Sequence, residues 1–294
     1  MLLVDKPVGV SSHDVVSAAR RALGESRVGH TGTLDPFATG LLILLVGRAT
    51  RLAQFVADEP KMYDAVLRFG SETDTEDLDG TVVREATAPA MATLQSAIAR
   101  HVGTMEQVPP AFSAKRIGGQ RAYALARVGA PVDLKPVTVT IHSIVLLDAV
   151  ETDGVVLEAT IRVSCAGGTY VRSLARDIGR DCGSAAHLVA LRRLSAGEFR
   201  ADSALSLANI GDAPRALAPP LVALAGHAQQ LLTAEEAALV VRGIDVEARV
   251  DGAHAALVLS AADNPAPFLV AFAERRPSER GDRWQPRVVM RDPQ

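Results

Sequence analysis

This chain of 294 residues lacks the marks of several large protein classes. Its two cysteines, Cys165 and Cys182, fit no metal-ligand spacing, and their number is too small for a structural zinc site. No run of eighteen uninterrupted apolar residues is present, and the start of the sequence lacks the layout of a signal peptide. The sequence therefore predicts a cytoplasmic protein with two buried thiols and no membrane contact.

The chain also lacks the basic excess that RNA-binding proteins often carry, because its net charge is −3 at pH 7. The distribution of charge is more informative than the sum. Residues 1–200 hold 22 basic and 22 acidic side chains, whereas residues 201–294 hold 9 and 12. Within the first part, residues 107–135 and 162–200 each carry an excess of four positive charges. Such clusters form either solvated helix faces or phosphate-contacting surfaces.

The most informative segment is residues 29–40, which read Gly-His-Thr-Gly-Thr-Leu-Asp-Pro-Phe-Ala-Thr-Gly. Its glycines and proline exclude a helix or a regular strand, and the apolar run 41–46 predicts a buried strand that supports this loop. Asp35 lies at the centre of the loop. A carboxylate in a stiff loop can act as a nucleophile or a general base, although an Asp-Pro pair alone more often marks a local turn.

Two stretches partly match known ligand-binding motifs but lack residues that those motifs require. The glycine-rich loop has no Gly-Lys-Ser/Thr ending, so it is not a phosphate-binding P-loop. The acidic run of residues 72–79 has Thr75 and Ala86 where an EF-hand needs calcium ligands. We interpret the acidic run as a solvated hairpin loop between strands at 63–69 and 81–84.

Helical and strand patterns interleave without regular βαβ spacing, which favours the α+β class with a large mixed or antiparallel sheet and flanking helices. A helix is expected from Asp14 to Leu23, capped by Ser11-Ser12 and ended by Gly24. Further strands are expected at 41–46, 63–69, 137–147 and 155–165, and further helices at 90–101, 120–128, 169–182 and 204–210.

The chain is expected to divide into a domain of residues 1–220 and a small domain of residues 221–294. Residues 213–220 contain three prolines and are the best linker candidate. Beyond them, Thr233 caps a predicted helix that runs through Arg242. Short strands near 246–250, 255–259, 268–273 and 286–290 make the small domain β-rich.

Residues 29–40 closely resemble the catalytic motif of the tRNA pseudouridine-55 synthases, the TruB family of pseudouridine synthases. The resemblance spans about residues 2 to 199. Its other motifs occur in the family's order, at residues 2–12, 61–75, 109–123, 168–174 and 187–194. A chance match of this many ordered motifs is very improbable.

The resemblance implies roles for individual residues. Asp35 is the essential catalytic residue, and Tyr63 stacks on the target uracil and assists proton removal from C5. Arg172 would hold the Asp35 carboxylate, because a planar guanidinium fixes a carboxylate's orientation. Since only one residue separates them, Tyr170 and Arg172 would share a face in extended backbone. Substrate-binding residues line the cleft or lie in an RNA-binding insertion at about 104–135: Lys6, His30, Tyr170, Leu191, Lys115, Arg116 and Arg121.

The same resemblance implies a function. The chain would isomerise uridine 55 in the T-loop of tRNA to pseudouridine, in a central active-site cleft that receives the flipped base. The partner is tRNA, the expected form is a monomer with a PUA-like C-terminal domain, and no cofactor or metal is needed. Asp35 acts either as nucleophile or as base toward the sugar. The alternatives are a non-catalytic RNA-binding or tRNA-folding chaperone and a small-molecule nucleosidase, although a nucleosidase would leave the basic clusters without a purpose.

Overall fold

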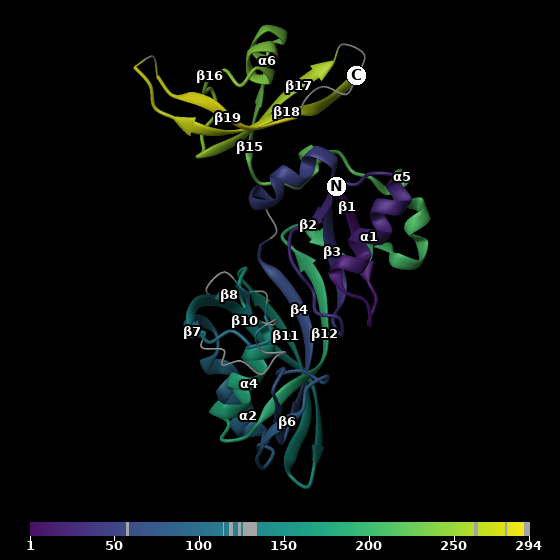
Figure 1. Cartoon of the computed structure of the whole chain (residues 1–294). Helices are drawn as coiled ribbons and strands as arrows, with labels where there is room; N and C mark the ends of the chain where they lie inside the picture. The colour runs from purple at the N-terminus through teal and green to yellow at the C-terminus, as the bar shows by residue number, and fades with distance from the viewer. Residues whose placement is uncertain are drawn as a thin grey trace. The chain divides into compact units, whose positions relative to one another are not determined.

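The computed structural model describes the chain except for residues 57–58, 114, 118–119, 123–124, 126–133, 262–263, 280 and 291–294. Two compact units divide the chain. The first comprises residues 1–36, 40–58 and 198–294, and the second comprises residues 37–39 and 59–197. The α+β class with a large mixed sheet and flanking helices is confirmed (Figure 1). Within the described ranges, none of the helices has the length and apolar content needed to cross a bilayer.

The N-terminal part of the first unit is a small mixed sheet covered by a helix. Strand β1 (Leu2–Lys6) pairs antiparallel with β3 (Thr39–Val46) and parallel with β14 (Leu205–Ser206), while β2 (Val28–His30) pairs with the other edge of β3. Six consecutive residues of β3 are buried, as expected for a strand covered on both faces. Helix α1 (Ser12–Leu23) packs its apolar stripe on β1 and β3.

Helix α1 begins and ends where the sequence predicts. The Ser11 hydroxyl accepts a hydrogen bond from the Asp14 amide, and the Asp14 carboxylate accepts one from the Ser11 amide, which completes a capping box. Gly24 ends the helix at φ 62°, in the left-handed region that glycine tolerates best. The local signals of this segment therefore agree with its packing.

The C-terminal part of the first unit has its own five-stranded sheet, in the order β15-β17-β18-β19-β16. Its elements are β15 (Ala228–Leu231), α6 (Ala234–Val241), β16 (Val246–Glu247), β17 (His254–Ala261), β18 (Asn264–Arg276) and β19 (Arg283–Val289). Thr233 caps α6 as predicted, and Trp284 lies fully buried in a core separate from that of α1. The β-rich character of this segment is confirmed, and the domain boundary at residue 220 stays a prediction.

Short helical turns of the first unit follow β3 or precede β15. They are η1 (Gly47–Phe55), η2 (Ala201–Ser203), η3 (Leu207–Asp212), α5 (Ala213–Ala216) and η4 (Pro220–Leu224). The linker expected at residues 213–220 is partly folded onto the N-terminal layer. Ala213 is buried in the core of α1, and the backbones of Met1 and Ala218 exchange two hydrogen bonds of 2.8 Å.

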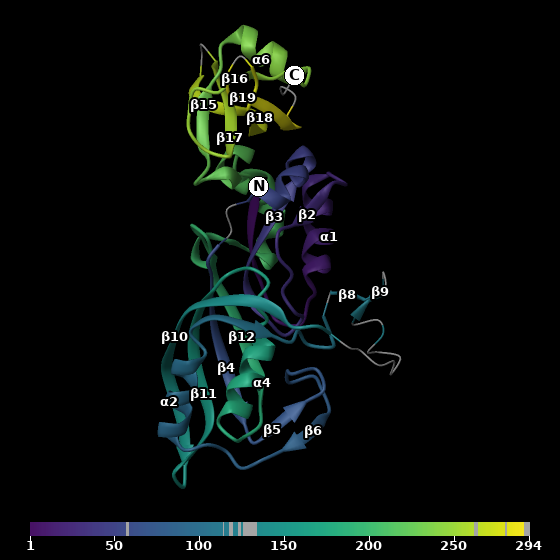
Figure 2. The same cartoon turned by 90° about the vertical axis from the view of Figure 1, so that its left-hand side faces the viewer.

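The second unit is built on an antiparallel sheet in the order β12-β4-β11-β10-β7. Its elements are β4 (Lys61–Phe69), β5 (Ser71–Thr73), β6 (Val82–Glu85), α2 (Met91–Arg100), β7 (Gly103–Gln107), β8 (Arg116–Ile117), β9 (Gln120–Arg121), β10 (Val137–Thr152), β11 (Val155–Cys165), α4 (Val171–Asp181) and β12 (Ala186–Ala196), with β13 (Phe199–Arg200) following in the chain. Helix α4 packs on β12 and β4, and α2 packs on α4 and β10. The hairpin β5–β6 lies beside α4 (Figure 2).

One predicted helix is wrong, and a second is confirmed in part. In the predicted helix 120–128, residues 120–121 form the strand β9, Ala122 and Leu125 are helical, and the others lie outside the described residues. Residues 204–210 form β14 and the 3₁₀ turn η3. In residues 204–210 an apolar spacing that suits a helix belongs to a short strand and a turn, because periodicity cannot separate these in so few residues.

The side chain of Gln230 joins three elements of the C-terminal sheet. Its amide oxygen accepts hydrogen bonds from Trp284 Nε1 and the Arg249 amide, and its nitrogen donates to the Glu247 carbonyl. Gln230→Ala should lower the free energy of unfolding by about 2–3 kcal/mol, because buried groups lose their partners. Fluorescence of Trp284, the only tryptophan, reports this loss in urea titrations. The exposed neighbour is the control: Gln229→Ala should change stability by less than ~0.5 kcal/mol, and equal effects would contradict the role of Gln230.

Candidate functional site

The loop that carries Asp35 is held on both sides of the carboxylate. Residues 31–38 form neither helix nor strand, as predicted, whereas residues 29–30 and 39–40 at the ends of the segment belong to β2 and β3 and correct the prediction there. Before Asp35, the Ser12 hydroxyl donates to the Leu34 carbonyl and accepts from the Leu34 amide, at 3.0 and 2.9 Å. After it, the Pro36 carbonyl accepts from the Gly9 amide at 2.9 Å. Asp35 itself is half-buried. The first unit thus presents one carboxylate from a backbone with little freedom.

Lys6 is a second constraint on this loop. Its side chain is fully buried, and its ammonium donates to the carbonyls of Pro7, Val10 and Pro36 at 3.0, 2.7 and 3.2 Å. Burial lowers the pKa of Lys6 to about 8, and the nearby Asp35 charge opposes that shift. The ammonium therefore ties β1 to the Asp35 loop and places a positive charge near the carboxylate.

His30 ends β2 at the start of the same loop. It is half-buried, and it lies opposite Leu44 in the β2–β3 ladder. The next amide, of Thr31, donates to the Ile43 carbonyl at 3.2 Å. His30, Lys6 and Asp35 thus belong to one part of the first unit, which agrees with the grouping that the sequence predicts.

In the second unit, Tyr63 and Leu191 share a face of the sheet. Tyr63 of β4 lies opposite Arg193 of β12, and Leu191 lies opposite Ala65. Residues two apart on a strand point to the same face, so Tyr63 and Leu191 are diagonal neighbours. Each is only 8% exposed. The two predicted residues are brought together by register.

Tyr170 precedes α4 and is fixed through its backbone. The side chain of Gln107 accepts from the Tyr170 amide at 2.9 Å and donates to the Tyr170 carbonyl at 3.1 Å. Of Tyr170 and Arg172, only Tyr170 has extended backbone, because α4 begins at Val171. The expectation that Tyr170 and Arg172 share a face through extended backbone is therefore wrong: Arg172 is a residue of the first helical turn.

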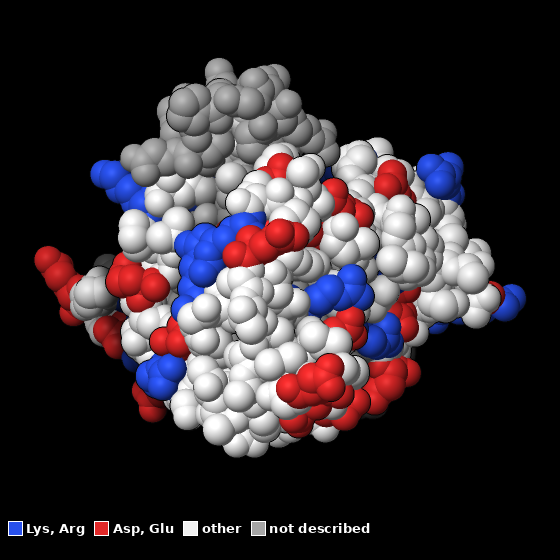
Figure 3. Space-filling view, turned by 90° about the horizontal axis from the view of Figure 1, so that it is seen from below, with Lys and Arg blue, Asp and Glu red and all other residues white. Residues whose placement is uncertain are grey.

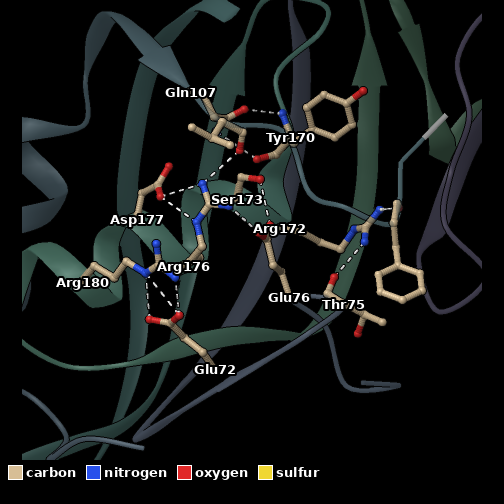
Figure 4. Close-up of polar contacts among 12 residues, drawn as sticks. Glu72, Thr75, Glu76, Gln107, Tyr170, Arg172, Ser173, Arg176, Asp177 and Arg180 are labelled. Atoms are coloured by element: carbon tan, nitrogen blue, oxygen red, sulfur yellow. Dashed lines mark hydrogen bonds and ion pairs between the residues drawn. The ribbon is translucent and has the colours of Figure 1, made fainter. Parts of the chain in front are cut away.

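The guanidinium of Arg172 is buried among acceptors of the second unit. It donates to the Thr75 carbonyl at 2.8 Å (Figure 4) and to the Phe112 carbonyl at 2.9 Å, and it lies 3.5 Å from the Asp77 carboxylate. An arginine at a helix N-terminus faces the positive end of the dipole, so an anionic partner is expected there, and Asp77 is one. The predicted pair of Arg172 with Asp35 would join the two units and stays a prediction.

Three arginines at four-residue intervals on α4 bind the acidic run of residues 72–77. Arg176 pairs with Glu76, which also accepts from the Ser173 hydroxyl, and Arg180 pairs with Glu72 (Figure 4). Burial raises the pKa of Glu76, against the opposing effect of Arg176. Burial alone would also raise the pKa of Glu72, but hydrogen bonds from Arg180 and Arg84 outweigh it and lower the pKa.

This arrangement corrects two expectations. The acidic run is no solvated loop, because Glu72, Glu76 and Asp77 are each less than 9% exposed. The basic cluster of residues 162–200 is no continuous phosphate-binding surface either, because Arg172 and Arg176 are buried and paired inside the protein. On the face seen in Figure 3, lysines and arginines are accordingly interspersed with acidic side chains.

The basic residues predicted for RNA contact in the insertion are only partly described. Arg116 and Arg121 lie opposite each other in the β8–β9 ribbon, and the Lys115 carbonyl accepts from the Ala122 amide at 2.7 Å. Arg127 lies outside the described residues. Their roles therefore stay predictions.

Sequence reasoning missed the roles of Ser12 and Gln107, which position the Asp35 loop and Tyr170. In the sequence, Ser12 indicates only part of a helix cap, and Gln107 lies in no motif. Their partners lie 22 and 63 residues away in the sequence, so only the folded chain identifies them.

Two family models match this chain. Residues 20–171 match the N-terminal domain of the TruB family pseudouridylate synthases, and residues 172–218 match the C-terminal domain of tRNA pseudouridylate synthase B. The chain belongs to the TruB family of pseudouridine synthases. As a member of this family it is an isomerase.

Two relatives illustrate the similarity. The chain is 46% identical to tRNA pseudouridine synthase B of Bordetella parapertussis over 211 residues. The aligned residues cover 70% of this chain and 84% of that protein. It is 40% identical over 248 residues to tRNA pseudouridine synthase B of Thermobifida fusca, covering 83% and 85%. A chain in a solved H/ACA RNP bound to a substrate RNA containing 2′-deoxyuridine shares the fold, with a TM-score of 0.72, 21% identity and coverage of 99% and 84%.

Lys6→Met should lower the rate of isomerisation by about 100-fold, because three carbonyls lose their donor and small displacements of a catalytic group have effects of that size. Single-turnover kinetics measure the loss. Arg215→Met, at an exposed arginine outside the predicted RNA-contact segments, is the control and should react like the unmodified protein. Similar rates in both variants would show that the ammonium does not position the loop.

The lowered pKa of Lys6 also predicts a pH effect on stability. Above about pH 8 the folded protein loses this proton, whereas the unfolded chain keeps it until about pH 10.4. The unfolded state then binds more protons, so this group makes stability rise with pH across that window. Urea titrations at pH 7.5 and 9.5 should show this contribution in the unmodified protein and its absence in Lys6→Met.

Arg176→Met should destabilise the protein by about 3–5 kcal/mol, because it leaves the buried Glu76 carboxylate without its cation. Arg200 forms an exposed pair with Asp202, so Arg200→Met should cost less than ~1 kcal/mol. The double variant Glu76→Leu/Arg176→Met should regain most of the stability that Arg176→Met loses. Urea titrations measure all three, and a double variant as unstable as Arg176→Met would contradict the pairing.

Proposed function

We propose that this chain isomerises uridine 55 in the T-loop of tRNA to pseudouridine. The observation that carries the proposal is the Asp35 loop, in which Ser12, Gly9 and Lys6 hold the residues on either side of one carboxylate. The family supplies the reaction class, and the relatives named tRNA pseudouridine synthase B support tRNA as the substrate.

The reaction exchanges one bond for another within a single nucleotide. The N1–C1′ glycosidic bond breaks, the uracil rotates, C5 bonds to C1′, and the C5 proton is removed while N1 gains one. No atom is gained or lost overall, so no external group is transferred. The base must leave its stack before it reaches a protein carboxylate, and aromatic contact compensates part of that cost.

The proposed roles follow from the two units. Asp35 attacks the sugar as a nucleophile or takes a proton from it as a base. Tyr63 stacks on the uracil and assists removal of the C5 proton. Arg172 orients the Asp35 carboxylate, with its own guanidinium held by Thr75, Phe112 and Asp77. Lys6 and His30 support the loop from the first unit.

The alternative function, of a class other than enzymes, is that of a non-catalytic tRNA-folding chaperone. Binding alone needs no carboxylate in a rigidly held loop, because a negative charge repels the phosphate backbone. The family membership also favours the enzyme. The proposed site of action is the cytoplasm, where the tRNA substrates are found, and the proposed acting form is a monomer.

Asp35→Asn should abolish isomerisation while changing tRNA affinity by less than about tenfold, or ~1.4 kcal/mol. The amide keeps the shape of the side chain and removes both nucleophilicity and basicity. Pseudouridine formation in a tRNA transcript and filter binding measure the two quantities. Asp153→Asn, at an exposed hairpin tip, is the matched control and should be fully active. Turnover of Asp35→Asn above a few per cent would exclude the assigned role.

Arg172→Lys should lower the rate at least ~100-fold, equivalent to about 2.7 kcal/mol of activation free energy. Lysine keeps the charge, but its single nitrogen cannot span the acceptors that the guanidinium fork reaches. Single-turnover kinetics at saturating tRNA measure the effect, with Arg200→Lys as the control. A near-normal rate would show that position 172 contributes charge alone.

A further inference from the structure

A hollow of about 610 Å³ in the first unit collects four arginines from three separate segments. Arg27 precedes β2, Arg48 and Arg51 lie on η1, and Arg242 follows the last residue of α6. Two valines, Val241 and Val289, supply most of the remaining wall. Among the described residues, the lining contains no acidic side chain.

These arginines differ from most others in the protein. Elsewhere, exposed arginines such as Arg68, Arg100 and Arg249 form ion pairs with neighbouring acids. The side chains of Arg48, Arg51 and Arg242 form no ion pair with any acid that the structure describes. Arg27 has a long contact of 3.7 Å with Glu25 and is 63% exposed. Four like charges around one hollow repel one another unless an anion joins them.

The two sides of the hollow are held together by contacts inside the first unit. At the end of η1, the Phe55 ring lies 4.6 Å from the Phe272 ring of β18 and 5.6 Å from the His254 ring of β17. His227 Nε2 lies 2.8 Å from the Phe55 carbonyl. The arginines of η1 and the arginine after α6 thus belong to one packed body, which reduces the entropy lost when a ligand bridges them.

The chemistry of the wall identifies the ligand class. Pockets for small organic molecules are lined mainly by apolar side chains, whereas four of the seven residues that line this hollow are arginines. Guanidinium forks bind phosphate oxygens two at a time. An open hollow with several such forks suits consecutive phosphates of a nucleic-acid backbone.

The hollow also lies away from the Asp35 loop. Strand β3 runs from Thr39, four residues after Asp35, to Val46, two residues before Arg48. At roughly 3.3 Å per residue, its ends are on the order of 20 Å apart. A phosphate bound in the hollow is therefore well removed from the uridine that Asp35 attacks.

We propose that this arginine hollow binds backbone phosphates of tRNA outside the T-arm. The proposal rests on the proposed function, because it takes the substrate of that reaction as the ligand. The hollow contributes to affinity for the complete tRNA and takes no part in the chemical step.

The test compares two double variants with the same charge change. Arg48→Gln/Arg51→Gln removes two charges from the hollow, and Arg200→Gln/Arg215→Gln removes two exposed charges elsewhere in the same unit. Each protein is titrated with complete tRNA and with an isolated T-arm hairpin over a range of salt concentrations. The hollow variant should bind complete tRNA about 5–20-fold more weakly, and its log–log salt slope should be shallower by about 0.7–0.9 for each phosphate that the protein no longer neutralises.

The single-turnover rate at saturating tRNA should stay unchanged, as should binding of the hairpin. Arg242→Gln alone should show a smaller loss of the same kind. Equal binding of complete tRNA by both double variants would overturn the proposal, as would an equal loss toward the hairpin, which would place the phosphates within the T-arm. Failure of the unmodified protein to form pseudouridine would overturn the proposed function instead, independently of these comparisons.

Discussion

The buried ammonium of Lys6 is the interaction on which the Asp35 loop depends. Three carbonyls from two stretches of chain converge on it, and the charge cannot leave that position without orphaning all three. Burial lowers its pKa to about 8, which shows that the fold bears a cost to keep the cation there. The result is a loop without secondary structure that nevertheless holds one carboxylate in a defined place, as a preorganised catalytic group requires.

In the second unit, ion pairs hold the segments around Arg172 in place. Helix α4 directs Arg172, Arg176 and Arg180 onto the acidic segment that follows β4, so the start of the helix and the β5–β6 hairpin are fixed against each other. Buried pairs of this kind add little net stability but penalise every alternative packing that separates them. The device orients Arg172 and keeps both Arg172 and Arg176 inside the protein.

That use of arginine changes how the charge of this chain is interpreted. A net charge of −3 by itself disfavours RNA binding, and much of the basic cluster at 162–200 is engaged internally. The arginines that remain for phosphate contact are those whose neighbours are not acidic, such as Arg48 and Arg51 beside the hollow. Affinity for a polyanion depends on these local groupings, because salt screens charges more than about 10 Å apart.

The sequence by itself determined the features that depend on residues close together in the chain, such as helix ends and buried strands. Ser11 and Gly24 bound α1, Thr233 caps α6, and the apolar run after Gly40 forms the buried strand β3. The motif around Asp35 resembles that of the TruB family, and this resemblance predicted the family that the comparisons show. Only the tertiary structure decided that Ser12 and Lys6 hold this loop, that Gln107 binds Tyr170, and that the acids of residues 72–77 are buried. Each of these contacts depends on partners brought together from distant parts of the chain. A run of acidic residues has the same sequence pattern whether it faces water or a row of arginines, so the sequence could not predict its burial.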